Sequence, residues 1–210
     1  MLRLAAWLSP AYPIGSFAWS HGLEARVAEG AVTGRATLER WIADLLCFGA
    51  GRSDAILVAH AYRAGSDAVA LAGLSALAGA LAPSAERLRE TTALGTAFAA
   101  VTAASWGGPG ITRPYPVALG EAAAASRLPL EPTLAFFLQT LASSQISAGI
   151  RLIPLGQTDG QRVLAALLPL CRTVAAEAAT AGLEDLGGST ILGDIASMRH
   201  EDLPVRLFQS

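Results

Sequence analysis

The segment Gly149–Gln161, GIRLIPLGQTDGQ, contains the clearest break between two helical patterns in the chain. Pro154 ends the preceding apolar run because proline has no N–H for the helical hydrogen-bond ladder. Gly156 leaves the backbone free to turn. Thr158 and Gln161 have the spacing of a capping box, which predicts that Thr158 opens the next helix. Together these residues predict two helices joined by a short turn.

Arg151 is the one charged residue between Glu131 and Asp159, and it is our best single candidate for a functional side chain. A guanidinium in an apolar span must be paired, hydrogen-bonded or exposed. Two interpretations stay open: a buried ion pair or cap on nearby carbonyls, and a contact with a partner protein. The same alternatives apply to Gln157 and Gln161, and local capping is preferred for Gln161.

Helical patterns bounded by proline, glycine or a capping residue continue on both sides of this joint. Strand alternation is scarce, and alanine, the best helix former, is very frequent. We see no repeat at a fixed period and no linker long enough to divide the chain. The sequence therefore predicts an all-α fold, a single-domain bundle of roughly nine or ten helices with a C-terminal tail. The expected bounds are residues 1–188 for the helical domain and 189–210 for the tail.

Several local expectations follow from the same patterns. Ser16 is expected to cap a helix that runs to about Glu29, and Ser53, Asp67 and Ser84 to open later helices. The segment 68–81 is apolar nearly all round and is expected to lie inside the bundle. Pro169 lies within the last long helical pattern and is expected to kink it.

Composition excludes several classes of protein. The net charge of -2, with 15% charged residues, gives no sign of a nucleic-acid partner. The long uncharged spans 68–85 and 91–112 are made mostly of Ala, Gly, Ser and Thr, and polar side chains interrupt 132–150. They argue against a membrane helix, which needs about 20 mostly apolar residues. The N-terminus is too soon broken by prolines for a signal peptide. We expect a cytoplasmic protein with two free cysteines, Cys47 and Cys171.

Known catalytic signatures are missing from the sequence: there is no phosphate loop, zinc-protease helix or nucleophile elbow. His21, His60 and His200 are not spaced as helical ligand pairs, so we expect no metal site and no cofactor. His21 is expected to pack, and His200 to face water or a partner. A Ser–His–Asp triad assembled only in space stays open. The alternative hypothesis is therefore a helical enzyme with an unrecognised small-molecule site.

The tail, Ser189–Ser210, is rich in large apolar residues, including Ile191, Met198 and Phe208. A short helix is expected near 191–198. A loosely held terminus is one interpretation. A disordered end is usually poorer in such residues, so a tail that orders on a partner is preferred.

Three separated motifs resemble the UreF family of urease accessory proteins: LSPAYPIGSFAWSHGLE, RLIPLGQTDGQ and DIASMRHEDLPVRLFQS. The helices between them match that family in order and length. The resemblance implies a cytoplasmic, non-enzymatic chaperone that forms a homodimer and has no cofactor of its own. From composition and charge we expect no nucleic-acid partner and no membrane contact. The resemblance further implies that the protein binds UreD (UreH in some bacteria), recruits the GTPase UreG and docks on apo-urease for nickel insertion.

The resemblance also implies partner-binding residues in three segments, which we call the head (8–24), the joint (149–161) and the tail (189–210). Phe17 stands where many relatives have tyrosine, and Pro204 falls at a tyrosine position of the tail. A GTPase regulator can act with an arginine in trans, and Arg151 is a candidate for that role. The implied partner-binding residues are Phe17, Glu24, Arg151, Pro154, Gln157, Gln161, Asp194, Met198, Arg199, His200, Glu201, Arg206, Leu207 and Phe208.

Overall fold

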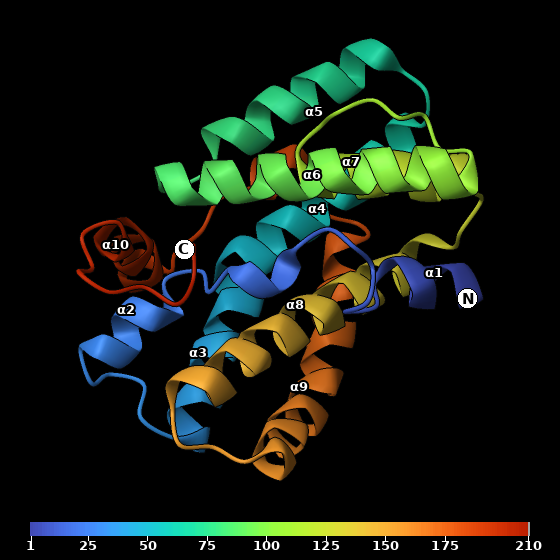
Figure 1. Ribbon diagram of the computed structural model, residues 1–210. Helices are drawn as coiled ribbons and strands as arrows, with labels where there is room; N and C mark the ends of the chain where they lie inside the picture. Colours follow the sequence, from blue (N-terminus) through green and yellow to red (C-terminus); the bar gives the residue numbers. More distant parts are fainter. Residues whose placement is uncertain (210) are drawn as a thin grey trace.

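The computed structural model describes residues 1–209, and all regular structure in that range is helical. The predicted all-α single domain is thus confirmed (Figure 1). Short 3-10 turns lie at Ser16–Ala18 and Leu183–Asp185. The α-helices are α1 (Leu2–Trp7), α2 (Leu23–Ala28), α3 (Arg35–Phe48), α4 (Ala50–Ala64), α5 (Ala68–Ala80), α6 (Ala85–Trp106), α7 (Tyr115–Ala125), α8 (Leu130–Leu152), α9 (Gln157–Ala178) and α10 (Ile191–His200).

Two of the predicted helix starts are confirmed by their capping hydrogen bonds. The Asp67 carboxylate accepts from the backbone N–H groups of Val69 and Ala70 and opens α5. The Ser84 hydroxyl accepts from the N–H of Arg87 and opens α6. In both helices a short polar side chain satisfies donors that the first turn leaves free.

Three other predicted starts are wrong. Ser16 opens only a 3-10 turn, and α2 begins later, at Leu23, because His21 and Gly22 have positive φ angles and break the helical path. Ser53 lies inside α4. At the joint, α9 begins at Gln157 after Gly156, so Thr158 is already in the first turn. Glycine is itself tolerated at the N-cap position, and no side-chain cap is needed there.

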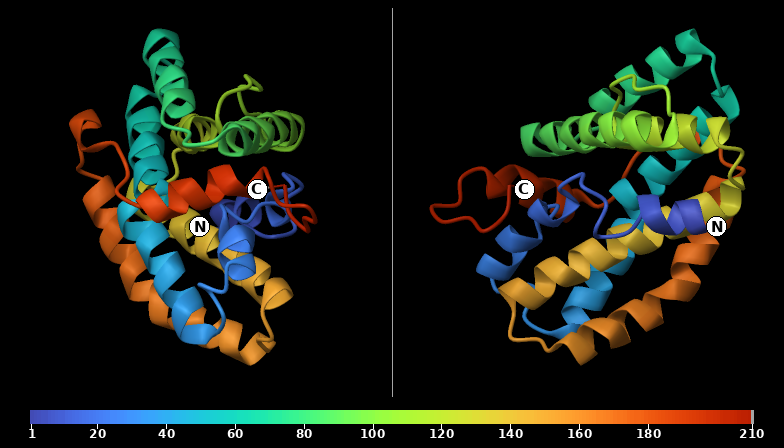
Figure 2. Two further views of the ribbon diagram at one scale, coloured as in Figure 1. Left: turned by 90° about the vertical axis from the view of Figure 1, so that its left-hand side faces the viewer. Right: turned by 45° about the vertical axis from the view of Figure 1, so that its right-hand side comes forward.

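Helix α4 runs through the centre of the domain and packs against α7 above it and against α3, α8 and α9 below it (Figures 1 and 2). Helices α8 and α9 form an antiparallel pair joined by the turn at residues 153–156. Gly120 lets α7 approach α4 closely, since a Cβ there would lie 2.4 Å from the Val58 carbonyl oxygen. Trp7 and Tyr115 each meet Phe98 edge-on, with ring centroids 5.5 and 5.6 Å apart.

The prediction that segment 68–81 lies inside the bundle is wrong. Helix α5 sits on the outside of the domain (Figure 1), and it buries only Leu71, Leu74 and Ala78. The Val69 side chain is 84% exposed. The other positions are mostly alanine and glycine, which cost little when they stay in water, so apolar composition alone did not indicate burial.

Two further expectations concern the long helices. Helix α9 contains Pro169, and the helix continues on both sides of it. None of the helices within residues 1–209 has the length and apolar character that a bilayer crossing would need.

Candidate functional site

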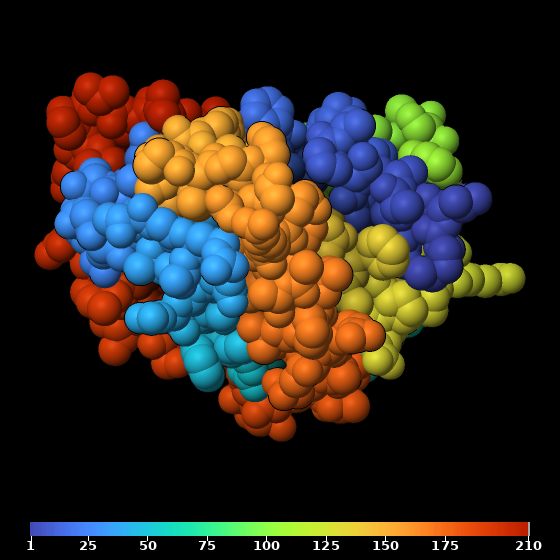
Figure 3. All heavy atoms as spheres, turned by 90° about the horizontal axis from the view of Figure 1, so that it is seen from below, coloured from blue at the N-terminus to red at the C-terminus, as the bar shows by residue number. Residues whose placement is uncertain are grey.

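The head, the joint and the tail, which are far apart in the sequence, come together at one end of the domain. Helix α10 packs against α2 and against the start of α6, and the 3-10 turn of the head packs against α8 (Figures 1 and 2). After α10 the chain returns to the head, where the Gln209 N–H donates to the Ala18 carbonyl at 2.8 Å. In Figure 3 the tail, the α2–α3 region and the α8–α9 turn occupy neighbouring parts of one face.

Glu24 anchors the tail from the first turn of α2. Its buried carboxylate accepts from the backbone N–H of Leu207 at 2.8 Å and from that of Phe208 at 3.0 Å. The same carboxylate lies 3.0 Å from Nε2 of His200. Glu24 therefore fixes both α10 and the segment that follows it.

His200 is completely buried, so the expectation that it faces water or a partner is wrong. Its Nδ1 lies 2.8 Å from the Glu86 carboxylate, and Arg206 donates to the other Glu86 oxygen at 2.9 Å. Glu86 itself is completely buried in the first turn of α6. We call Glu24, Glu86, His200 and Arg206 the tail cluster. The His200 ring is buried because it lies between two carboxylates, Glu24 on α2 and Glu86 on α6. The charged neighbours of His200 in the sequence, Arg199 and Glu201, gave no sign of this contact.

Arg151 lies exposed at the end of α8 and links all three segments. It donates to the Phe17 carbonyl at 2.8 Å and to the Ser147 carbonyl of its own helix at 3.3 Å. Its guanidinium carbon lies 4.3 Å from the centroid of the Phe208 ring, a cation–π distance. Of the interpretations left open, capping of nearby carbonyls is confirmed, and a buried ion pair is wrong. Partner binding is compatible with this exposed position.

The other candidate residues divide into buried and exposed groups. Phe208 is buried, and Asp194 is half-buried, where burial raises the pKa of its carboxyl against the opposing charge of Arg87. Arg199 is exposed and pairs with Glu29 at 3.1 Å. The remaining candidates are exposed at the surface, namely Phe17, Pro154, Gln157, Gln161, Met198, Glu201, Arg206 and Leu207.

A second buried network was not predicted from the sequence. Arg87 pairs with Glu90 and lies 3.4 Å from Asp54, while His21 lies 2.9 Å from Glu90. Burial raises the pKa of Glu90, but the charges of Arg87 and His21 outweigh it and lower that pKa to about 2. Burial also raises the pKa of Asp54. Several charged residues stand in the first turns of α6, a sequence pattern that is typical of a solvent-exposed helix end. The spacing of Arg87 and Glu90, one helical turn apart, was the only sign in the sequence that these charges form an ion pair.

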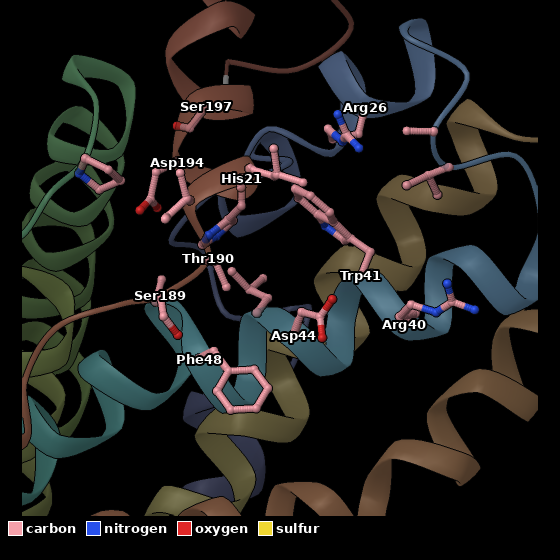
Figure 4. Close-up of a pocket in the computed structure, with 18 of the residues that line it drawn as sticks. His21, Arg26, Arg40, Trp41, Asp44, Phe48, Ser189, Thr190, Asp194 and Ser197 are labelled. Atoms are coloured by element: carbon pink, nitrogen blue, oxygen red, sulfur yellow. The ribbon is translucent and has the colours of Figure 1, made fainter.

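A pocket of about 550 Å³ lies between α3 and the start of α10 (Figure 4). Trp41, Asp44 and Phe48 line it from α3, and Thr190 and Asp194 line it from the tail. His21 and Arg87 of the buried network form part of its wall. Its volume falls in the range of small-molecule sites. Within residues 1–209, no cluster of three His, Cys, Asp or Glu side chains is placed to hold a metal ion.

The chain is similar in sequence to known proteins over its whole length. The family model UreF matches residues 32–168. The chain is 55% identical over 210 residues to "Urease accessory protein UreF" of Cereibacter sphaeroides strain KD131, covering all of this chain and 98% of the relative. It is 46% identical over 221 residues to the protein of the same name from Rhodopseudomonas palustris strain HaA2, covering all of this chain and 93% of that relative.

Proposed function

Because the chain belongs to the UreF family of urease accessory proteins, we propose that it acts as an adaptor in urease maturation. In this role it binds UreD (or UreH) and recruits the GTPase UreG to apo-urease, so that nickel is inserted into the urease active site. The adaptor works in the cytoplasm, as a homodimer, and without a catalytic site or cofactor of its own. Nickel is the cargo of the assembly.

The observation that carries this proposal is the convergence of head, joint and tail on one face. Inside, the tail cluster and Phe208 hold the tail in place. Outside, Phe17, Met198 and Leu207 are 66%, 49% and 69% exposed. Arginine, methionine and aromatic side chains are enriched at protein interfaces. These exposed apolar side chains, together with exposed Arg151, therefore suit a protein partner better than they suit water.

We assign binding roles to most of the exposed residues, and positioning roles to the buried ones, to half-buried Asp194 and to exposed Arg206, which donates to Glu86. Phe17, Arg151, Met198, Arg199, Glu201 and Leu207 form the proposed partner surface, and Pro154, Gln157 and Gln161 extend it along the α8–α9 turn. Asp194, Glu24, His200, Arg206 and Phe208 act by shaping the tail. On this proposal residues 1–188 are the scaffold, and residues 189–210 are the partner-binding tail.

Deleting the gene tests the adaptor role as a whole. Urease protein should stay abundant in the deletion strain, but its nickel content and activity should fall, and a plasmid copy of the gene should restore both. Fully active, nickel-loaded urease in the deletion strain would show that the chain is not needed for maturation.

Surface variants test where UreD binds. Met198→Asp and Leu207→Asp place a charge on exposed apolar positions and should weaken UreD retention in a pull-down without changing the helical circular dichroism. The matched control is Val69→Asp on α5, where the side chain is 84% exposed and far along the chain from the three motifs. Truncation after Gly188 should also weaken UreD binding. Equal retention by all variants would place the UreD surface elsewhere.

The pocket between α3 and α10 favours a second candidate function, an enzyme acting on a small molecule. Asp44, Asp194 and His21 supply ionisable groups at its wall. This alternative requires that the purified chain turn over a metabolite and that Asp194→Asn abolish the turnover. Turnover that is absent across a broad metabolite panel would eliminate it.

A further inference from the structure

The hydrogen bonds of the tail cluster need one more proton than a neutral His200 and two ionised carboxylates provide. Both ring nitrogens of His200 face carboxylate oxygens, Nδ1 at 2.8 Å from Glu86 and Nε2 at 3.0 Å from Glu24. An ionised carboxylate can only accept hydrogen bonds, and a neutral imidazole donates from only one nitrogen. Two hydrogen bonds therefore require one additional proton, either on His200 or on one of the carboxyl groups.

The other contacts of the two carboxylates place this proton on His200. Glu24 also accepts from the N–H groups of Leu207 and Phe208, and Glu86 also accepts from Arg206. Donors of this kind stabilise the ionised form of a carboxyl group. His200 is then an imidazolium between two carboxylates.

Charge balance supports the same assignment. With His200 protonated, the two negative charges of Glu24 and Glu86 are matched by His200 and Arg206. Buried charges are tolerated when they are paired in this way. Arg89 approaches Glu86 at 3.8 Å, but its side chain is largely in water and is screened.

Neighbouring charged groups are occupied elsewhere. One turn along α6, Glu90 pairs with Arg87 and His21. On α10, Arg199 pairs with Glu29 at the surface, and Asp194 lies at the pocket wall. The position of the proton in the tail cluster therefore depends on the four side chains of that cluster.

We propose that His200 is a positioning residue whose protonated ring locks residues 201–209 onto α2 and α6, so that loss of its proton releases the tail. After that loss, one ring nitrogen presents a lone pair to a carboxylate oxygen at a site with no solvent access. The docked tail is therefore stable at lower pH and is lost as pH rises. This inference rests on the proposed function in one respect: the released tail no longer holds Phe208 against Arg151 or presents Leu207 at the proposed surface, which weakens partner binding.

NMR of the full chain with ¹⁵N-labelled histidine tests the lock without any partner. Both ring nitrogens of His200 should show imidazolium shifts while the amides of Leu207 and Phe208 keep their docked shifts. As pH rises, the docked-to-released ratio should fall, by no more than about tenfold per pH unit because one proton is lost. A neutral His200 ring with a docked tail, or a tail released at every pH, would overturn the proposal.

Two variants separate a protonation lock from a purely structural role. In Glu86→Gln, the amide oxygen can accept from Arg206 and the amide NH2 can donate to Nδ1 of a neutral His200. The tail should then stay docked as pH rises, and the pH dependence should disappear. His200→Gln should release the tail at every pH. The control is His60→Gln on α4, where the ring lies against the Ala181 carbonyl and away from the tail cluster. The tail of this variant should behave like that of the parent chain.

Glu86→Gln with an unchanged pH dependence would refute the lock. The UreD pull-down repeated across the same pH range separates the two proposals. If the tail is released with pH but UreD retention does not change, the lock stands and the assigned UreD surface fails.

Discussion

Glu90→Gln should remove much of what the buried network contributes to stability. The Glu90 carboxylate pairs with Arg87 and His21, and the carboxyl pKa is lowered from 4.5 to about 2. Each pH unit between these two values corresponds to about 1.4 kcal/mol, so the network favours the charged form by on the order of 3 kcal/mol. Breaking a buried ion pair by removing one partner typically costs about 3–5 kcal/mol. We therefore expect a loss of roughly 3 kcal/mol at pH 7.

Denaturant unfolding of the parent chain and of Glu90→Gln, compared at a series of pH values, measures this effect. The lowered pKa stabilises the fold fully above pH 4.5, and this contribution is lost as pH falls toward about 2. The difference between the two proteins should therefore shrink over that interval. Glu177→Gln on α9, where the side chain is exposed, is the control and should change stability by less than about 0.5 kcal/mol. A Glu90→Gln loss below about 1 kcal/mol at pH 7, or a difference that does not change with pH, would refute the reasoning.

Three further changes test other parts of the structure. Arg151→Ala loses exposed contacts, so unfolding should shift by less than about 1 kcal/mol while urease activation in cells falls; a variant that unfolds would contradict this. Gly95→Ala places a Cβ 1.9 Å from the Arg113 carbonyl oxygen and should cost about 3 kcal/mol in denaturant unfolding, whereas Gly73→Ala on α5 meets nothing within 4 Å and should be neutral or stabilising. Burial raises the pKa of Cys171 to about 11, so its thiol should react with a disulfide reagent at pH 8 only on unfolding.

Local sequence signals predicted the fold class and most helices because those signals act within a few residues. Asp67 and Ser84 cap the helices that they were expected to open, since a capping side chain reaches only the next turn. Ser16 failed because positive φ angles at His21 and Gly22 are decided by tertiary packing. A Cβ at Gly22 would lie 2.7 Å from the backbone of Ser197, which is 175 positions later in the chain.

The site was predicted less completely than the fold. Family motifs marked Glu24, Arg151 and His200, but only the structure shows which of them face inward. Glu86 lies outside those motifs and is nevertheless the second carboxylate on His200. Its neighbours Arg87, Arg89 and Glu90 are also charged, a pattern that is typical of a solvated turn. A pairing between α6 and α10 depends on how distant helices pack, and helical periodicity does not contain that information.

Residues 201–209 bury little apolar surface, so polar contacts must hold them against the domain. Of residues 201–209, Phe208 is the buried apolar side chain, and full burial of such a side chain contributes about 1.5–3 kcal/mol. Ordering that segment costs roughly 1–2 kcal/mol per residue. Apolar burial alone therefore does not keep the tail docked, and the polar contacts of Glu24, Glu86 and Arg151 decide whether it is. Hydrogen bonds and ion pairs require a particular geometry, so a tail that they hold has one docked position. Loss of these polar contacts is then sufficient to release it.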